Sequence, residues 1–380
     1  MTDVRTMGFT DVRTTNLAVV LSHLRTSGPS SRAAIAASTG LNKATVSSLT
    51  GDLIDQRLLR ETGTSGNRIG RPGTSLALDG SAYAAIGVQV SADSLTALAI
   101  DFAGDQILRW HRALGAHRTA EIVALTQRAA TRVRQQGRSV LGLTVAVPGL
   151  VDEAGVVRVS PALGWSDLDL RTLVAGSLRQ PGLVVTVANQ ASTAALTNKD
   201  PDSIFVTGLA GIEAGVIAGG RPLHGSRGFT GQIGRFTLGP AGAPTLHDLA
   251  GIEPLVRRIL TDSDPESLAD LHPAVEQVAL LARSGDTAAL TALHDTGRHL
   301  GQGLALLANL TDPSAIVLGD HYATLAEWLI PAAEAALAGQ VLAPGGVRLI
   351  ASELGSHAAA LGGALSHLAR VDSGALPKAV

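Results

Sequence analysis

The sequence predicts an α/β protein in which a small helical head, residues 15–80, precedes two mixed α/β lobes. Helix-spaced apolar residues, capping residues and tight turns fill the head. After Tyr83, apolar strands alternate with amphipathic helices, and the series repeats once. The 380 residues include 43 glycines but only 3% aromatic residues, as expected for an α/β chain with many tight turns. This length exceeds one ordinary domain.

The head begins with two helices. An apolar stripe with helical spacing consists of Leu17, Val20, Leu21 and Leu24. Gly28-Pro29 then ends this helix, and Ser30 or Ser31 can cap a second one that carries Ile35 and Ala36.

A third helix follows a tight turn at Gly40. Asn42 stands where an N-cap belongs, and the helix is expected over about residues 43–57. Its inward positions are Val46, Leu49 and Leu53. The opposite face carries small polar side chains, which suit a helix that enters the major groove of DNA.

Two short strands, residues 58–62 and 75–78, are expected to pair after this helix as a wing. The loop between them contains Gly70-Arg71-Pro72-Gly73, and its arginines suit a phosphate or minor-groove contact. Duplex DNA is therefore the predicted partner, although an ordinary three-helix domain with a polar surface is the alternative. The predicted contacts are Ser31, Asn42, Lys43, Thr45, Ser47, Ser48, Arg68 and Arg71.

Charge and composition set further bounds. Residues 1–80 hold nine Lys/Arg and six Asp/Glu, and the remainder holds 21 and 26, so a mildly basic head precedes an acidic body. A head this weakly charged is expected to act as a dimer. The absence of cysteine excludes disulfides and thiolate metal sites. Without an apolar signal or membrane-spanning segment, we expect a soluble cytoplasmic protein. Residues 1–14, with a repeated Thr-Asp-Val-Arg-Thr, are expected to form a flexible arm.

The body shows two similar halves around a cleft. Strands at 85–90, 94–101 and 106–111, a helix at 121–136 and a strand at 140–147 form the first series, and a second begins at 204–207. This pattern predicts the two-lobed actin/hexokinase-like (ASKHA, ribonuclease H-like) architecture. The smaller lobe is expected over 81–199 plus 356–380, and the larger lobe, with an oligomerisation surface, over 200–355.

A set of motifs makes a family resemblance specific. In chain order they are Gly70-Arg71-Pro72, residues 147–152 (VPGLVD), 160–165 (SPALGW), 189–191 (NQA), 228–235 (GFTGQIGR), 309–313 (NLTDP) and 317–319 (VLG). With these motifs the chain resembles the ROK family (repressors, open reading frames and sugar kinases), in its DNA-binding branch. The resemblance implies a transcriptional regulator, most simply a repressor, that is dimeric or tetrameric.

Departures from the family pattern argue against kinase activity, so we expect no enzyme and no catalytic residue. The resemblance places the sugar-activating Asp of the kinases at Gln190, which cannot accept the hydroxyl proton. Residues 87–91 lack the Asp-x-Gly phosphate loop. Glu213 stands where a glycine is expected beside the ATP phosphates, and its carboxylate would repel them. A sugar kinase with a fused head is the alternative.

The resemblance also implies a zinc site that this chain cannot build. Arg235 replaces the ligating His, and the following loop has no cysteine, so no metal and no cofactor is expected. His224 and His247 are interpreted as surface histidines.

The resemblance implies an effector cleft that comprises Pro148, Gly149, Asn189, Gln190, Gln232, Arg235 and His247. The exchanged residues leave this set with about one positive charge. In one interpretation the cleft binds a sugar phosphate or acidic sugar anchored by Arg235, with Arg221, Arg227 or His247 nearby, and its closure changes the spacing of two DNA-reading heads. In the other, the cleft is vestigial, Arg235 pairs with a neighbouring carboxylate, and DNA binding is independent of an effector.

Overall fold

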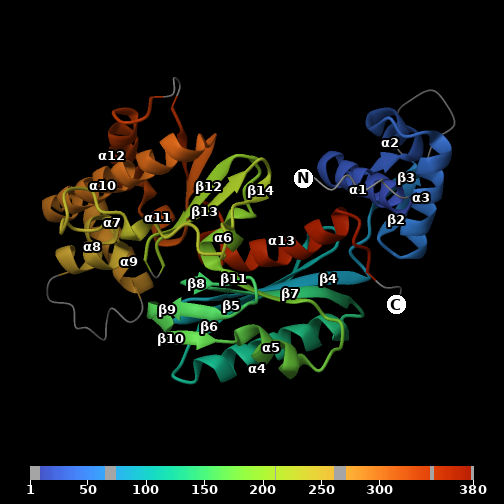
Figure 1. The fold of residues 1–380 in the computed structure, drawn as a ribbon, viewed down its shortest axis with the longest axis horizontal. Coiled ribbons are helices and arrows are strands. Elements are labelled where there is room, and N and C mark those ends of the chain that lie inside the picture. Colours follow the sequence, from blue (N-terminus) through green and yellow to red (C-terminus); the bar gives the residue numbers. More distant parts are fainter. Residues whose placement is uncertain (1–8, 65–73, 210, 261–270, 343–345, 378–380) are drawn as a thin grey trace.

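The computed structural model describes residues 9–64, 74–209, 211–260, 271–342 and 346–377. Figure 1 shows the head at one end of the molecule, the smaller lobe beneath it and the larger lobe at the other end. Within the described residues, no helix is both long and apolar enough to cross a membrane.

The head is a three-helix unit with a small sheet. Its elements are α1 (Phe9–Ser27), β1 (Ser30–Ser31), α2 (Arg32–Thr39), α3 (Lys43–Asp55), β2 (Leu59–Thr64) and β3 (Thr74–Leu78). The wing strands β2 and β3 are antiparallel, and β1 pairs with the other edge of β3. The predicted flexible arm is wrong for its last residues, because α1 begins at Phe9 and so includes 9–14.

Local capping explains why the second and third helices start where they do. The Ser31 side chain accepts a hydrogen bond from Ala34 N at 3.2 Å, and Asn42 Oδ1 accepts one from Thr45 N at 2.8 Å. Each bond satisfies an amide that the helix itself leaves free. Gly40 ends α2 with φ of 74°, a left-handed conformation that glycine adopts without strain.

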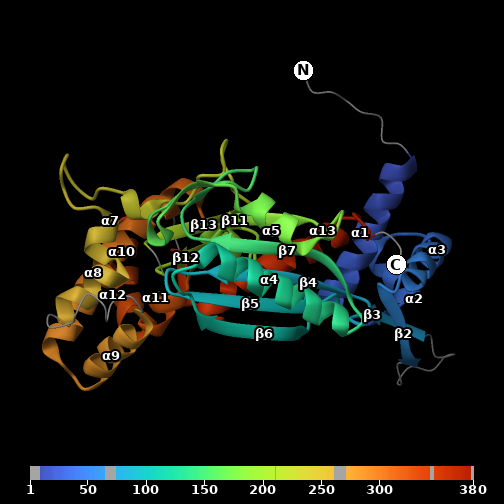
Figure 2. The ribbon, with the colours of Figure 1, turned by 90° about the horizontal axis from the view of Figure 1, so that it is seen from below.

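The smaller lobe is built on a five-stranded sheet with the order β11-β7-β4-β5-β6. Its elements are β4 (Tyr83–Val90), β5 (Ser94–Asp101), β6 (Gln106–Ala113), α4 (Arg118–Gln135), β7 (Ser139–Val147), α5 (Leu170–Leu178), β11 (Val185–Asn189), α6 (Gln190–Ala195) and α13 (Ala358–Asp372). Strands β4, β7 and β11 are mutually parallel, whereas β5 is antiparallel to both of its neighbours. Helices α4 and α5 cover the outer face of the sheet, and α13 covers the inner face (Figures 1 and 2).

The smaller lobe also contains a small second sheet that the sequence pattern does not predict. Strands β8 (Leu150–Val151), β9 (Val157–Ser160) and β10 (Trp165–Leu168) form it, with a short 3₁₀ turn, η1 (Pro161–Leu163), between the last two. Helix α5 is not predicted either. The three strands have two to four residues each, too few to show a period of two.

The larger lobe repeats the same sheet plan, with the order β14-β13-β12-β15-β16. Its strands are β12 (Ser203–Thr207), β13 (Glu213–Ala218), β14 (Arg221–Pro222), β15 (Ala315–Leu318) and β16 (Arg348–Ala351). Its helices are α7 (Leu246–Ala250), α8 (Ile252–Ile259), α9 (Leu271–Arg283), α10 (Thr287–Thr311), α11 (Asp320–Thr324) and α12 (Ala326–Ala338), and short 3₁₀ turns occur at η2 (Ile233–Arg235) and η4 (Gly355–His357). In both sheets an antiparallel meander joins two parallel strands, which confirms the predicted two-lobed α/β fold.

A glycine separates two short consecutive helices of this lobe. Gly251 has extended backbone, with ψ of 148°, and so ends α7 and precedes α8. Helix α12 likewise follows the separate short helix α11.

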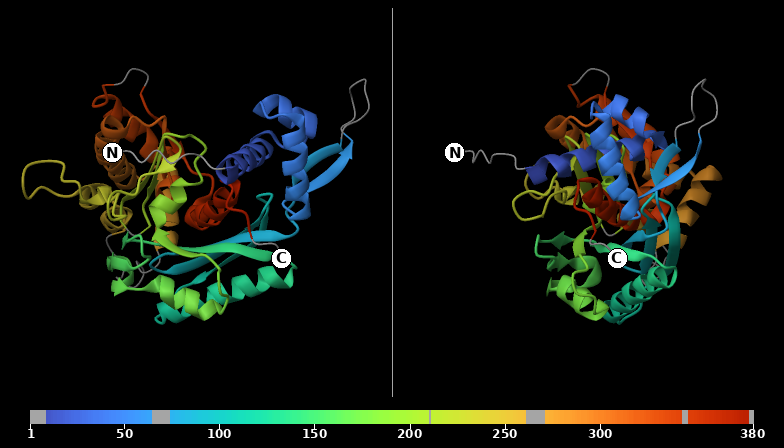
Figure 3. Two further views of the ribbon diagram at one scale, coloured as in Figure 1. Left: turned by 45° about the vertical axis from the view of Figure 1, so that its right-hand side comes forward. Right: turned by 90° about the vertical axis from the view of Figure 1, so that its right-hand side faces the viewer.

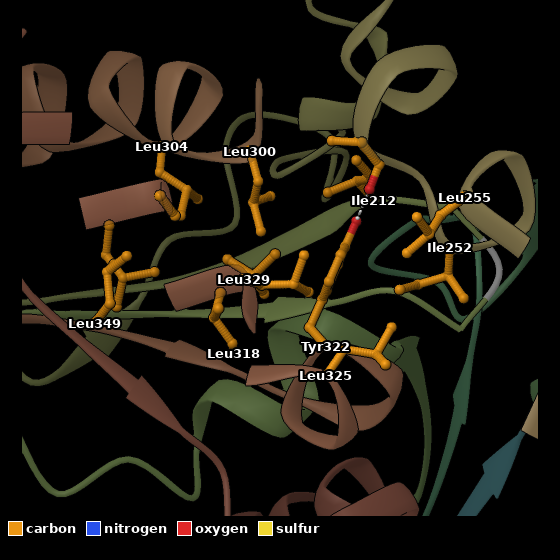
Figure 4. Packing of buried hydrophobic residues seen from close by; sticks show 14 of the residues in the cluster. Ile212, Ile252, Leu255, Leu300, Leu304, Leu318, Tyr322, Leu325, Leu329 and Leu349 are labelled. Carbon is orange, nitrogen blue, oxygen red and sulfur yellow. Dashed lines mark hydrogen bonds between the residues drawn. The ribbon is translucent and has the colours of Figure 1, made fainter. Parts of the chain in front are cut away.

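The core of the larger lobe lies between its sheet and helices α7–α12 (Figure 4). Tyr322 is fully buried there, and its hydroxyl donates to Ala250 O at 2.8 Å. Helices α10 and α12 pack closely because Gly297 and Gly301 face α12, where an added Cβ would lie 2.6 Å from Leu329 O and 2.2 Å from Ala333 O, respectively.

The head and the smaller lobe share one hydrophobic core. Leu17, Leu21 and Leu24 of α1 belong to the same buried cluster as Phe102 of the lobe and Leu368 of α13. Figure 3 shows α1 lying against the C-terminal part of α13. The head is therefore not suspended on a loose linker, and a movement of α13 reaches it directly.

A bidentate ion pair reinforces this junction. Arg25 of α1 donates to the Asp372 carboxylate of α13 through Nε at 2.5 Å and Nη2 at 3.0 Å. Its Nη2 also donates to Phe102 O, and its guanidinium lies 5.1 Å from the Phe102 ring centroid. Both side chains are largely buried, with 26% and 16% exposed, so solvent screens this pair less than a surface pair.

Replacing Asp372 by asparagine should loosen the head from the body. Arg25 would keep its buried position but lose its counter-charge, and we expect a loss of about 2 kcal/mol in the free energy of unfolding of the head. Calorimetry should then show the head melting before the body. The matched control is Glu253→Gln, which breaks the exposed Glu253–Arg257 pair on α8 and should cost less than about 0.5 kcal/mol. Equal effects of the two substitutions would contradict the proposed anchoring.

Candidate DNA-binding surface and effector cleft

Six of the eight predicted DNA contacts belong to the described residues, and five of these lie on α3 or at its N-cap. Lys43, Ser47 and Ser48 are exposed on α3, whereas Thr45 is half-buried. Ser31 and Asn42 cap α2 and α3 and so lie at the two helix N-termini, where amides and the helix dipole favour a phosphate. The predicted wing residues Arg68 and Arg71 lie outside the described residues.

Arg32 holds the third helix of the head in place. Its Nε donates to Thr50 Oγ1 on α3 at 3.1 Å, and its Nη2 forms an ion pair with Glu61 of β2 at 3.0 Å. Val46, Leu49 and Leu53 are buried beneath α3, as predicted. These contacts fix the position of α3, so its exposed polar face has a defined orientation.

A cavity of about 360 Å³ lies between the lobes, where the effector cleft was predicted. This volume is at the small end for ligand pockets and suits a ligand the size of a monosaccharide. Five of the seven predicted residues line it: Pro148, Gly149, Gln232, Arg235 and His247. Asn189 and Gln190 are buried and do not line the cavity, and neither do the two arginines considered as additional anchors, Arg221 and Arg227.

Glu213 is a cavity residue that the sequence interpretation did not assign to this site. Its carboxylate is buried at the start of β13 and accepts hydrogen bonds from Gly149 N at 3.0 Å, Asn189 Nδ2 at 3.1 Å and Gln232 Nε2 at 3.0 Å. Burial raises the pKa of Glu213, and these hydrogen bonds oppose the rise. The sequence could have indicated this role, because a carboxylate at the start of an apolar strand needs hydrogen-bond partners within the protein.

Backbone geometry fixes the floor of the cavity. Gly149 has φ of +102°, and a Cβ at this position would lie 2.2 Å from Val159 O, so the turn requires glycine. Asn189 caps α6 by accepting hydrogen bonds from Ala191 N and Ser192 N, and its Nδ2 donates to Gly149 O at 2.8 Å. The hydrogen-bonding capacity of the Asn189 side-chain amide is therefore satisfied within the protein.

The rim of the cavity carries opposite charges. Arg235 is exposed and makes no ion pair within the described residues, so the neighbouring carboxylate expected by the vestigial interpretation is not in contact with it. Asp248, which also lines the cavity, forms a capping box with Thr245. Hydrogen bonds from Thr245 lower the pKa of Asp248, helped by the charges of His247 and Arg235. With Glu213 and Asp248 included, the cavity lacks the net positive charge expected from the sequence.

Two buried polar side chains near the cavity have unused hydrogen-bonding atoms in the described part of the chain. Ser160 is fully buried and lines the cavity, but its hydroxyl makes no hydrogen bond. The amide atoms of Gln190 also lack a well-formed hydrogen bond, although the side chain lies close enough to Glu213 to favour its charged form. Unpaired buried polar groups are costly and mark positions where a ligand can supply the missing partner.

Two further buried polar side chains, Gln89 and Asp320, lie at or just after the ends of β4 and β15. Gln89 of β4 accepts from Ala359 N and Ala360 N at 3.1 and 3.3 Å, so this side chain occupies the N-terminus of α13. Asp320, after β15, adds a buried carboxyl group that accepts from Thr207 Oγ1 at 2.5 Å. Burial raises the pKa of Asp320 to about 7, with the Thr207 bond opposing the rise. Within the described residues no group of His, Asp and Glu side chains is arranged to hold a metal ion.

The sequence profile of the ROK family matches residues 85–369, three quarters of the chain. The chain belongs to the ROK family.

Comparisons that include the head distinguish two branches of ROK proteins. The xylose repressor of Bacillus spizizenii is 28% identical and covers 93% of this chain, and 94% of that repressor is matched. The crystal structure of a ROK transcriptional regulator homologous to the Escherichia coli MLC protein superposes with a TM-score of 0.77 and 22% identity over 96% of this chain and 97% of that one.

A ROK glucokinase from Streptomyces griseus superposes with a TM-score of 0.62 and 24% identity. The superposition covers 98% of the glucokinase chain but only 74% of this chain, so about a quarter of this chain has no counterpart in the glucokinase. The chain is a ROK-family transcriptional regulator, and the xylose repressors of Bacillus spizizenii and Bacillus subtilis each match 93% of it.

Proposed function

We propose that this protein is a cytoplasmic repressor that binds a palindromic DNA site as a homodimer or homotetramer and responds to a small ligand in its interlobe cavity. The observation that carries the proposal is the rigid junction between the head and the body. A head that merely tethered the protein to DNA would not need to share a core with the lobe that forms the cavity floor.

The exposed polar face of α3 supports the first part of the proposal. Lys43 at the start of the helix suits a phosphate, and Ser47 and Ser48, with Thr45 beside them, suit base edges in the major groove. Asn42 and Ser31 place two helix N-termini where backbone phosphates would lie. Because the head carries only a small positive charge, two heads held by an oligomeric body would supply the affinity that one lacks.

The cavity supports the second part. The proposed ligand is a sugar phosphate or acidic sugar whose anionic group binds Arg235, because this guanidinium is uncommitted, whereas the carboxylates of Glu213 and Asp248 are already engaged by hydrogen bonds within the protein. The xylose repressor is named for a neutral sugar, whereas here the polar floor is already occupied by Glu213.

A continuous set of contacts connects the cavity to the head. Asn189 is both a partner of Glu213 and the N-cap of α6. Helix α6 packs against α13 so closely that a Cβ at Gly362 would lie 1.9 Å from Thr193 O. At its other end, α13 holds α1 through Asp372. A ligand that moves α6 would therefore shift α13 and reorient the head, which is how differential binding would reach DNA.

Selection of bound sequences from a random DNA pool by the purified full-length protein tests the proposal. Two identical heads should enrich an inverted repeat whose half-sites are about 10 base pairs apart, or a multiple of that distance. A single unpaired motif would contradict the oligomeric part of the proposal, and no enrichment at all would contradict sequence-specific DNA binding.

A further inference from the structure

Three hydrogen-bond donors converge on the Glu213 carboxylate from both sides of the cleft. Gly149 N and Asn189 Nδ2 come from the smaller lobe, and Gln232 Nε2 comes from the same lobe as Glu213 itself. Glu213 is only 6% exposed and yet lines the cavity. A side-chain carboxylate of the protein therefore lies at the floor of its own ligand pocket and joins the two lobes.

The donors that Glu213 engages are the ones a ligand would need. Gly149, Asn189 and Gln232 all belong to the residue set that the sequence assigns to the effector. A donor already bonded to a buried carboxylate can bind a ligand hydroxyl only after the carboxylate has moved, and charge-assisted hydrogen bonds of this kind are about twice as strong as neutral ones. A neutral hydroxyl is a poor competitor for them.

We infer that Glu213 is the specificity-determining residue of this cleft and acts as a built-in occupant that excludes neutral monosaccharides. The inference rests on the proposed ligand-controlled function. Glu213 holds the donors at the floor and leaves Ser160, Arg235 and His247 for a ligand. It also keeps the two lobes joined at the floor when no ligand is bound, so a neutral sugar has no free donors with which to close the cleft.

Replacing Glu213 by alanine tests the inference by isothermal titration calorimetry. The probes are D-xylose, D-glucose and N-acetyl-D-glucosamine, titrated into the full-length protein. The wild type should bind none of them with a Kd below about 1 mM. Glu213→Ala frees two donors of the smaller lobe and should bind at least one probe at least about tenfold more tightly than the wild type does.

Two further variants serve as controls. One keeps the volume of the Glu213 side chain without its charge, and the other removes a carboxylate elsewhere in the same lobe. Glu213→Gln fills the same volume but offers one neutral acceptor oxygen in place of two charged ones, so it should exclude the sugars less completely than the wild type and more completely than Glu213→Ala. Glu276→Ala removes an exposed carboxylate from α9 of the same lobe and should behave as the wild type does. Unchanged thermal unfolding of each variant verifies its fold.

Binding of any of these sugars to the wild type below about 1 mM would overturn the inference, whether or not the variants fold. A folded Glu213→Ala protein that gains no sugar affinity would also overturn it. Because calorimetry uses no DNA, failure of the proposed DNA-binding function would appear only in the DNA selection and would leave this result intact.

Discussion

Replacing Ser47 and Ser48 by glutamate should weaken DNA binding by at least about a hundredfold. Both side chains are exposed on α3 and make no hydrogen bond within the described part of the head, so the substitutions should leave its fold intact. In the major groove, two carboxylates would face acceptor-rich base edges and phosphates. A good hydrogen-bonded pair with a base is worth about 1–3 kcal/mol, and the repulsion of the new charges weakens binding further. Fluorescence anisotropy with a selected DNA fragment measures the effect.

The control for charge alone is Thr287→Glu with Thr291→Glu. Both threonines are exposed on α10 of the larger lobe, and the double substitution changes the net charge by the same amount. This variant should bind DNA within about twofold of the wild type. If the two double variants lose affinity equally, α3 is not the helix that enters the groove.

Replacing Asp320 by asparagine should stabilise the protein, and the gain should grow with pH. The pKa of Asp320 is about 7 in the folded protein because the carboxyl group is buried, above the ordinary value of 3.8. The folded state therefore binds more protons than the unfolded state between these values, and stability falls as the pH rises from about 4 to 7. Asparagine has no charge to bury. The stabilisation by Asp320→Asn should increase by about 3 kcal/mol between pH 5 and pH 8.

Asp312→Asn is the matched control for this substitution. Both aspartates have left-handed backbone, with φ of 51° at Asp320 and 46° at Asp312, a region that asparagine tolerates well. Asp312 is exposed at the end of α10, so its substitution should have little effect at either pH. Chemical denaturation at pH 5 and pH 8 gives the free energy of unfolding. A gain from Asp320→Asn that is independent of pH would show that the buried carboxyl group is not the cause.

The head could be predicted almost completely from its sequence because its signals are local. Asn42 and Ser31 lie three residues before the amides they cap, and Gly40 sets its turn through its own backbone angle. The buried stripe of α1 follows from helical spacing alone. What the sequence did not show is that α1 also packs on α13, because Arg25 and Asp372 are separated by 347 positions.

The cleft was predictable in its position but not in its chemistry. Motif order identified five residues that line the cavity, since the fold brings the ends of the corresponding strands together. The sequence interpretation set Glu213 beside ATP phosphates instead of at the cavity floor, because its partners Gly149 and Asn189 come from the other lobe. The short strands β8–β10 could not be predicted for a related reason. They are strands because they pair with one another, and their own sequences carry no strand pattern.

A genome-wide map of the DNA occupied by this protein in its own cells tests whether α3 reads specific DNA sequences. We expect a limited number of discrete sites that share one inverted repeat, and we expect these sites to be lost when Ser47 and Ser48 are replaced by glutamate. Uniform low occupancy, or discrete sites that persist in the double variant, would contradict the assignment of α3 as the DNA-reading helix of a sequence-specific regulator.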